Sequence, residues 1–288
     1  MPRQSLAWRV ARRVEQLEGL DRIAEPVQSG VRKAIPEPGR GKDLLSGTWL
    51  GHPLHPLLTD VVIGAWASAL ALDVLGGTRR GAADDLVGIG ALAALPAAIA
   101  GLSDWSDLKG RQRRVGTVHA AGNLVALALQ SCSWQARRRG RHATGVALST
   151  VAMATASASA WLGGHLTFGE GVGVDQTAFE TPPSAWTAVI DADRLENGEL
   201  VRRSARGTGV VLVRHRGAVH ALVDRCSHRG CSLSEGSFDG TSITCACHGS
   251  RFGLGGELLE GPATAPQPTL ETRIHDGKVE VRARQDER

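Results

Sequence analysis

The sequence predicts a multidomain protein in which an all-α, four-helix transmembrane bundle precedes an all-β domain that binds a metal. Two observations predict the bundle: residues 57–162 contain long stretches without charge, and clusters of arginine separate these stretches. A third observation predicts the second domain. Cysteine and histidine recur at close spacing between residues 226 and 248, and the surrounding sequence alternates as in β-strands.

Four segments are long enough, or nearly so, to cross a hydrocarbon layer of roughly 30 Å as helices. They are rich in Ala, Gly, Ser and Thr, and such small residues let helix backbones approach closely in lipid. A soluble bundle of buried helices is the alternative, but the arginine clusters between the segments are typical of headgroup anchors. The expected spans are Leu57–Leu75, Leu86–Leu102, Thr117–Trp134 and Ala143–Leu162.

The segment ahead of the spans places Leu6, Val10, Val14 and Leu17 on one helical face, with arginines opposite. This amphipathic pattern suits either an anionic membrane surface or packing on the protein's own helices. The net charge of +4 comes largely from arginine clusters beside apolar segments, without aromatic platforms for bases. We therefore expect contact with membrane lipid and no binding of nucleic acid.

An even number of spans returns the chain to its starting side, so both termini share one compartment. The basic N-terminal segment favours the cytoplasmic side of the cell membrane, although the basic loop at 137–141 would then lie outside. The multi-pass chain is expected to divide into four parts. These are a basic amphipathic segment (1–47), a membrane domain (48–176), a linker (177–183) and the second domain (184–288).

Alternation of the spans places four histidines at one membrane face, together with Asn123, which follows His119 by one helical turn. Polar groups at membrane depth usually face the bundle interior, and histidine commonly binds haem iron and other metals. We expect a second redox site, holding haem b, another metal or a quinone, at His55, His119, Asn123 and His165. The alternative, above all for His52 and His165, is a headgroup-level imidazole bonded to water and backbone.

Four short motifs lie in this half of the chain: WLGHPLHPLLTDVVIGAW, GLSDW, VHAAGN and GGHLTFGEGVGVD. Over residues 48–176 they resemble a bacterial family of four-span membrane proteins, domain of unknown function 2231. The resemblance implies a membrane domain whose histidines matter, and it assigns no activity. Phe168 stands where the family would be expected to carry tyrosine.

Two further motifs gather four of the chain's five cysteines. Cys226-x-His228 is followed by sixteen residues and then by Cys245-x-x-His248. Two thiolates and two neutral imidazoles could hold zinc, or a [2Fe–2S] cluster in which two histidines replace two cysteines on one iron. Glycines punctuate both loops, and a hairpin with its turn at Arg216-Gly217 precedes them. An all-β scaffold with two such loops favours the cluster over a zinc-finger helix.

The motifs CSHRGCSLSEG, CACHGSRF and GPATAPQPTLETR occur in this order within residues 184–283. Together they resemble a Rieske domain. The resemblance implies that Cys226 and Cys245 bind one iron of a [2Fe–2S] cluster, and that His228 and His248 bind the other.

The same resemblance implies a disulfide between Cys231 and Cys247, as in respiratory cytochrome bc complexes, which would hold the two glycine-rich loops together. A reducing cytoplasm disfavours disulfides, so this expectation conflicts with the expected side of the membrane. The fifth cysteine, Cys132, is expected to pack as a small hydrophobic residue in the third span.

Ser250 matches a position whose hydroxyl donates a hydrogen bond to the cluster, and such bonds raise the reduction potential. Phe252 stands where the high-potential subtype carries tyrosine, so that donor is missing. We expect a potential below that of quinol-oxidising respiratory proteins, within the broad Rieske range of roughly −150 to +300 mV. The motifs LSEG and GPATAPQP are similar to the ferredoxin-like branch.

The expected function is membrane-bound electron transfer, in which single electrons pass between the cluster and a haem- or quinone-type site in the membrane domain or a partner. The alternatives are a membrane-tethered Rieske ferredoxin that serves an oxygenase or reductase, and a redox sensor. The expected partners are membrane lipid and a redox protein or the quinone pool. The sequence contains no nucleophile–base motif and no phosphate loop, so an enzymatic role would be that of an oxidoreductase.

Overall fold

The computed structural model describes residues 5–76 and 80–284. The chain forms two compact units, one of Met1–Ile35 with Pro53–Val172 and the other of Pro36–His52 with Gly173–Arg288. The chain therefore passes between the units three times. This division differs from the expected linear one, because residues 36–52 fold with the second unit although they precede the first span in sequence.

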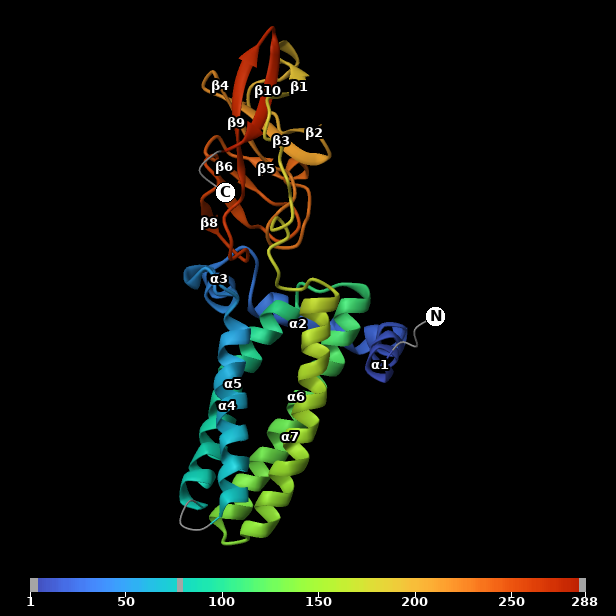
Figure 1. Cartoon of the computed structure of the whole chain (residues 1–288), viewed down its shortest axis with the longest axis vertical. Helices are drawn as coiled ribbons and strands as arrows, with labels where there is room; N and C mark the ends of the chain where they lie inside the picture. The colour runs from blue at the N-terminus through green and yellow to red at the C-terminus, as the bar shows by residue number, and fades with distance from the viewer. Residues whose placement is uncertain (1–4, 77–79, 285–288) are drawn as a thin grey trace. The chain divides into compact units, whose positions relative to one another are not determined.

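The first unit is helical. Its longest helices pair as α4 with α5, α6 with α7 and α5 with α6, and a π-helical turn, η4, continues α7 (Figure 1). The helices are α1 (Leu6–Glu15), α2 (Asp21–Ala34), α4 (Leu54–Leu75), α5 (Arg80–Trp105), α6 (Gly110–Arg138) and α7 (His142–Gly164), followed by η4 (His165–Gly169).

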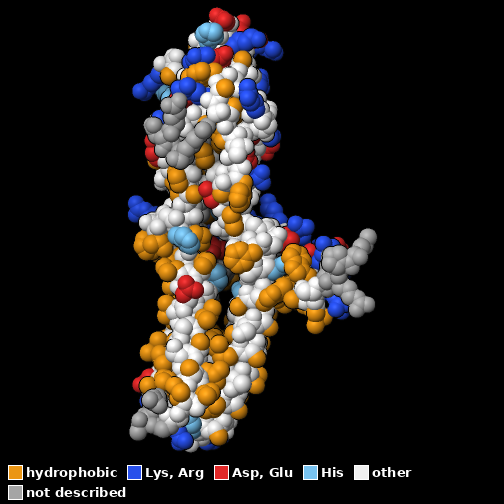
Figure 2. All heavy atoms as spheres, in the orientation of Figure 1, with side chains coloured by type: hydrophobic (Ala, Val, Ile, Leu, Met, Phe, Trp, Pro, Cys, Tyr) orange, Lys and Arg blue, Asp and Glu red, His pale blue; other side chains and the backbone are white. Residues whose placement is uncertain are grey.

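Large apolar side chains point outward from the long helices, whereas small residues fill the space between them. Figure 2 shows hydrophobic side chains over the visible face of this part of the chain, and Leu92 is 69% exposed. Inside, Ala97 and Ala126 pack around Trp66, whose indole ring lies directly against Gly90. This arrangement suits lipid outside and close backbone packing inside, as the small-residue content predicts.

Among the described residues, three helical segments are long and apolar enough to cross a membrane: Leu54–Leu75, Arg80–Trp105 and His142–Gly169. The remaining expected span falls in α6, which is 29 residues long. Its middle carries His119, Asn123 and Gln130, and these polar side chains lower its mean hydropathy.

Helix α1 packs on α6 through Ala11 and Val14, which join Val115 in one apolar cluster. Of the four residues expected on one face, Val14 is buried, whereas Leu6 and Val10 are exposed. The amphipathic segment thus contacts the protein's own helices and also presents an apolar surface outward.

The second unit contains two antiparallel sheets, with strand orders β1-β10-β9-β4-β3-β2 and β5-β6-β7-β8. The first sheet consists of β1 (Thr187–Asp191), β2 (Val201–Ala205), β3 (Thr208–His215), β4 (Ala218–Val223), β9 (Thr269–His275) and β10 (Lys278–Ala283). The second consists of β5 (Ser237–Phe238), β6 (Ser242–Thr244), β7 (Arg251–Gly253) and β8 (Leu258–Glu260).

Strand β3 is buried on both faces. Its successive side chains alternate between two apolar cores, because Val210 and Leu212 join one cluster and Val211 and Val213 join the other. The predicted hairpin between β3 and β4 is confirmed. Arg216 and Gly217 form its two-residue turn with φ values of 49° and 83°, as a type I′ turn requires.

Candidate redox sites

Cys226 and Cys245 belong to two loops with the same backbone design. In each loop the backbone N–H of the cysteine donates to the carbonyl of the residue five positions later. Cys226 N donates to Cys231 O at 2.8 Å, and Cys245 N donates to Ser250 O at 2.9 Å. A glycine four residues after each cysteine donates back to the cysteine carbonyl, Gly230 at 2.8 Å and Gly249 at 3.0 Å. The sequence motifs gave no sign of this equivalence except the matched spacing of cysteine and glycine.

Both glycines adopt the left-handed backbone region, Gly230 with φ 73° and Gly249 with φ 76°. A side chain is strained there, so glycine is the residue that lets each loop turn back on its cysteine. The loops differ in one respect, since His228 follows its cysteine by two residues and His248 follows by three.

The two thiols lie against each other in the apolar core beneath the loops. The Cys226 thiol donates to the Cys245 sulfur, and this bond together with burial raises the pKa of Cys226. The same bond and the backbone N–H groups of Cys247 and His248 lower the pKa of Cys245 to about 6. Backbone N–H groups of His228 and Arg229 point at the Cys226 sulfur in the same way. Each sulfur thus faces two backbone N–H groups, and these donors by themselves favour a thiolate.

The imidazoles of His228 and His248 form a second pair, with ring centroids 5.0 Å apart and planes nearly perpendicular at 89°. The donors are therefore grouped by type, sulfur with sulfur and nitrogen with nitrogen. This grouping fits a two-iron cluster whose irons carry different ligands better than it fits one tetrahedral zinc ion.

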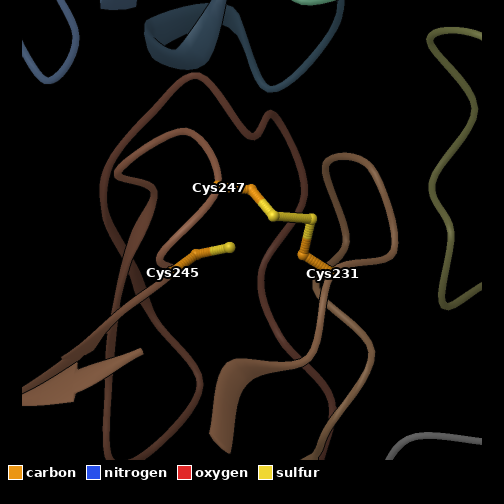
Figure 3. A group of neighbouring side chains, drawn as sticks. All are labelled: Cys231, Cys245 and Cys247. Carbon is orange, nitrogen blue, oxygen red and sulfur yellow. A yellow bond between two sulfur atoms is a disulfide. The ribbon is translucent and has the colours of Figure 1, made fainter. Parts of the chain in front are cut away.

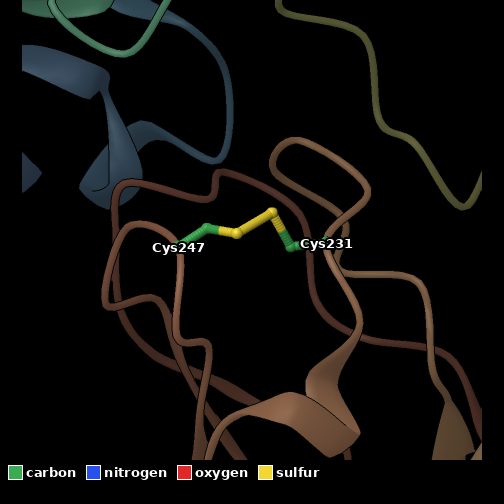
Figure 4. Close-up of a disulfide and its surroundings, with 2 residues drawn as sticks. All are labelled: Cys231 and Cys247. Carbon is green, nitrogen blue, oxygen red and sulfur yellow. A yellow bond between two sulfur atoms is a disulfide. The ribbon is translucent and has the colours of Figure 1, made fainter.

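A disulfide joins Cys231 to Cys247, as the resemblance implied (Figure 4). Its sulfurs lie within 4.8 Å of the Cys245 sulfur (Figure 3). Because each cysteine comes from a different loop, the bond ties the two loops together beside the thiol pair.

A third loop, residues 261–267, supports the other two. Gln267 is buried, and its amide donates to the carbonyls of Val223 and Arg225, both at 2.7 Å. The Ser227 hydroxyl donates to Ala265 O at 3.0 Å. Sequence reasoning recognised this loop as a motif but missed Gln267, which holds the strand that leads into the first cluster loop.

Ser250 and Phe252 are both fully buried beside the second loop. The Ser250 hydroxyl accepts a hydrogen bond from Ala263 N at 3.0 Å. Within residues 5–76 and 80–284 its own proton has no protein acceptor. Phe252 offers no donor at all.

The helical unit brings together His55, His119 and Asn123. The ring centroids of the two histidines are 6.4 Å apart, with planes at 89°. His55 Nδ1 lies 2.8 Å from Ala97 O, and His119 Nδ1 lies 2.7 Å from Ser159 O. A carbonyl only accepts, so each Nδ1 carries the proton and each Nε2 presents a lone pair. The Asn123 amide donates to His119 Nε2 at 3.1 Å.

Two glycines that sequence reasoning missed make room for these rings. A Cβ atom on Gly101 would lie 2.6 Å from the His55 ring, and one on Gly163 would lie 2.9 Å from the His119 ring. The imidazoles therefore pack directly on the backbones of α5 and α7. Both glycines begin motifs noted in the sequence, Gly101 in GLSDW and Gly163 in GGHLTFGEGVGVD.

His165 has different neighbours from the other predicted histidines. Its Nε2 lies 3.0 Å from Glu15 Oε1, and its ring lies between Trp161, which stacks on it at 5.7 Å, and Trp8 at 4.9 Å. His52 is exposed and folds with the second unit. The structure thus gathers three of the four predicted residues, whereas His165 contacts α1 through Glu15 and Trp8.

Two expectations are wrong, one for the basic loop at 137–141 and one for the third span. Arg137 is not a headgroup anchor, because its fully buried guanidinium binds Asp73 at 2.5 Å and Asp84 at 3.0 Å between the helices. Cys132 is not packed inside the bundle, because it lies on the exposed face of α6. Its neighbour Ser133 takes the buried position and donates to Gly145 O at 2.6 Å.

Comparison with protein families matches two parts of the chain. Residues 185–271 match the Rieske [2Fe-2S] domain, and residues 51–176 match the predicted membrane protein family DUF2231. The chain belongs to the Rieske [2Fe-2S] family. Both resemblances drawn from the motifs are thereby confirmed, and this Rieske protein carries a DUF2231 membrane domain in the same chain.

The Rieske part is similar to an iron–sulfur subunit and to a ferredoxin, among other proteins. It is 33% identical over 72 residues to the cytochrome b6-f complex iron-sulfur subunit of Chlorobaculum tepidum, covering 25% of this chain and 39% of that one. It is 33% identical over 98 residues to ferredoxin CarAc of Metapseudomonas resinovorans, covering 33% of this chain and 92% of that one. A solved relative is the ferredoxin of carbazole 1,9a-dioxygenase from Nocardioides aromaticivorans IC177, at 25% identity and a TM-score of 0.34, which covers 35% of this chain and all of the ferredoxin.

Proposed function

We propose that this protein transfers single electrons through a [2Fe–2S] cluster bound by Cys226 and Cys245 on one iron and by His228 and His248 on the other. The grouping of the two thiols and of the two imidazoles carries this assignment. The similarity to an iron–sulfur subunit and to a ferredoxin supports it. A bound cluster supplies reversible one-electron chemistry, and the protein holds its ligands, limits solvent access and sets its potential.

The protein's own donors tune that potential. Backbone N–H groups aim at both cysteine sulfurs, and the described part of the chain offers no acceptor to the Ser250 hydroxyl proton. Such donors favour the more negative reduced state and raise the potential. Phe252 removes one further donor, so we propose a potential below that of quinol-oxidising respiratory Rieske proteins.

We propose that His55 and His119 form a second redox site in the membrane domain. Their Nδ1–H groups are fixed on backbone carbonyls, as is usual for histidines that bind a metal through Nε2. The free Nε2 of His55 suits ligation of haem b iron or acceptance of a hydrogen bond from a quinol hydroxyl. Asn123 holds His119 Nε2 and would release it on ligation, or would itself bind a quinone carbonyl.

The membrane arrangement that we propose has four spans, with α6 as the third. Helix α6 packs along α5 and α7, and its polar side chains bond to neighbouring helices. Four spans put the N-terminus and the Rieske domain on the same side of the cell membrane. We propose the cytoplasmic side, on the basic N-terminal segment.

A second candidate function is that of a membrane-tethered ferredoxin for an oxygenase or reductase partner. The similarity to ferredoxin CarAc favours it, because the chain covers 92% of that protein. In this case the helical unit anchors the cluster and takes no part in electron transfer.

Spectroscopy of the intact protein in detergent separates the two functions. If the second redox site exists, the protein shows haem bands, or a quinol reduces its cluster. His55→Ala and His119→Ala are then expected to abolish the haem bands or the reduction by quinol. His165→Ala is the matched control, since its partners are Glu15 and two tryptophans. A cluster spectrum alone, unaffected by either substitution and unreactive with quinols, would leave the tethered ferredoxin.

A further inference from the structure

Residues 36–52, here named the pre-span segment, are part of the Rieske unit. The segment contains a short helix, α3 (Arg40–Ser46), and a single 3-10 turn, η2 (Thr48–Leu50). No motif of the Rieske resemblance includes it, and it lies more than 130 residues before that domain in sequence. Its side chains nevertheless contact loops that surround the proposed cluster.

Two side chains of the pre-span segment bind the third loop. Asp43 Oδ1 accepts the backbone N–H of Gly261 at 2.9 Å, and the Thr48 hydroxyl donates to Ala263 O at 3.1 Å. The fit is close. A Cβ atom on Gly261 would lie 2.8 Å from Asp43 Oδ1 and would overlap the Thr48 hydroxyl.

The segment also meets the second cluster loop. A Cβ atom on Gly249, the residue after His248, would lie 3.3 Å from the ring of Pro38. Within the segment, a buried ion pair between Lys42 and Glu37, at 3.1 Å, ties α3 to the residues that precede it. Burial of the Lys42 side chain, which is 1% exposed, indicates that the segment is a fixed part of the unit and not a loose linker.

The peptide groups of Ala263 connect the segment to Ser250. Thr48 fixes the carbonyl of Ala263, and the N–H of the same residue donates to the Ser250 hydroxyl at 3.0 Å. A hydroxyl that accepts from a fixed direction has fewer directions left for its proton. Ser250 is fully buried and lies two residues after His248, so a hydroxyl fixed at this position suits donation to the proposed cluster.

We propose that Asp43 and Thr48 are positioning residues for the Ser250 hydroxyl, and that the pre-span segment is thereby a fourth, distant part of the cluster site that raises its reduction potential. This inference rests on the proposed cluster. It does not rest on the second redox site, because none of its residues lies in the helical unit.

The direct test is the potential of the cluster, measured by redox titration monitored by EPR on the full-length protein. Thr48→Val keeps the shape of the side chain and removes its donor without a change of charge. We expect it to lower the potential in the same direction as Ser250→Ala, with unchanged iron content. Thr48→Ser, which keeps the hydroxyl, is the matched control and is expected to retain the wild-type potential.

Asp43 gives a test in which two effects have opposite signs. Removal of a negative charge by itself raises a reduction potential, whereas release of the Ser250 donor lowers it. Asp43→Asn loses the charge and keeps an oxygen that accepts from Gly261 N, and Asp43→Ala loses both. We therefore expect Asp43→Ala to have a lower potential than Asp43→Asn.

The double variants decide whether the effect passes through Ser250. With Ser250→Ala in place, Thr48→Val is expected to cause no further shift, because the two substitutions remove one interaction. Additive shifts would overturn the proposal, as would an unchanged potential in Thr48→Val with full cluster content. Loss of the cluster in Thr48→Val but not in Ser250→Ala would also overturn it.

Hydrogen exchange at the Ala263 amide gives a readout that needs no cluster. We expect Thr48→Val to speed this exchange several-fold and Thr48→Ser to leave it unchanged. Equal exchange rates in all three proteins would overturn the proposed connection from Thr48 through Ala263 to Ser250. If wild-type protein held no iron, the proposed function would fail, and the exchange rates would still test the connection from Thr48 to Ser250 by themselves.

Discussion

Cys226 and Cys245 occupy equivalent positions in two loops that are closed by the same pair of backbone hydrogen bonds, with a left-handed glycine four residues after each cysteine. In both loops the second and third amides after the cysteine point at its sulfur. Each loop thus orients one thiolate by its own backbone before any contact with the other loop. The disulfide and the third loop then hold the two preformed halves together.

The first prediction concerns the turn glycines. Gly249→Ala should destabilise the protein by about 1–2 kcal/mol, because alanine is strained at φ 76° and its Cβ meets Pro38. It should also lower cluster content. Gly277→Ala is the matched control, since Gly277 has φ 73° with nothing within 4 Å and lies in a distant hairpin turn. Chemical denaturation and iron analysis would check both. Equal loss of iron in the two variants would contradict a special role for the Gly249 turn.

The second prediction concerns the disulfide. The double variant Cys231→Ser/Cys247→Ser removes a disulfide that joins residues 16 positions apart. Because the bond restricts the unfolded chain, its loss should reduce the free energy of unfolding by about 3 kcal/mol. The cluster should still assemble, because backbone bonds close each loop independently. Denaturant midpoints with and without the substitutions, alongside the EPR signal, measure the two effects separately. Complete loss of the cluster under native conditions would show that the loops are not preformed.

The third prediction concerns the buried ion network of the helical unit. Arg137→Met removes the guanidinium that binds Asp73 and Asp84 between the helices, and should destabilise the unit by about 3–5 kcal/mol. Arg138→Met, on the exposed side of the same helix, should have little effect. Thermal unfolding in detergent would give a lower midpoint for Arg137→Met alone. Similar midpoints for the two variants would mean that the network contributes nothing to stability.

The fourth prediction concerns pH. Burial raises the pKa of the Asp43 carboxyl from its ordinary value of 3.8, and the neighbouring Glu260 acts in the same direction. A raised pKa means that the stability contributed by Asp43 is fully present below pH 3.8 and is lost as pH rises through the raised value. Asp43→Asn should therefore be more stable than wild type at neutral pH, and this advantage should vanish in acid. Unfolding of both proteins as a function of pH would test it; a constant difference would contradict the assignment.

Short motifs and periodicity were sufficient to predict the order of the two folds, the hairpin at Arg216-Gly217 and the disulfide between Cys231 and Cys247. These features depend on residues close in sequence or on a strong family resemblance. Charge patterns were less informative at Arg137. From sequence alone, an arginine at the end of a span is interpreted as a headgroup anchor. Its true partners here, Asp73 and Asp84, lie on two other helices.

The contacts that sequence reasoning missed join residues far apart in the chain. Asp43 and Gly261 are 218 residues apart, and Thr48 and Ala263 are 215 apart. No local pattern marks such pairs, because each residue is an ordinary loop residue by itself. Gly101 and Gly163 are similar cases, since only the folded bundle places an imidazole against each of them.

The proposed ligand set is tested most directly on anaerobically prepared, full-length protein by metal analysis together with pulsed EPR of the reduced state. Two irons and two acid-labile sulfides per chain are expected, with coupling of the unpaired electron to nitrogens of two imidazoles and loss of the signal in either His228→Ala or His248→Ala. Zinc without sulfide, or a cluster signal that survives both substitutions, would contradict the assignment of Cys226, His228, Cys245 and His248 as its ligands.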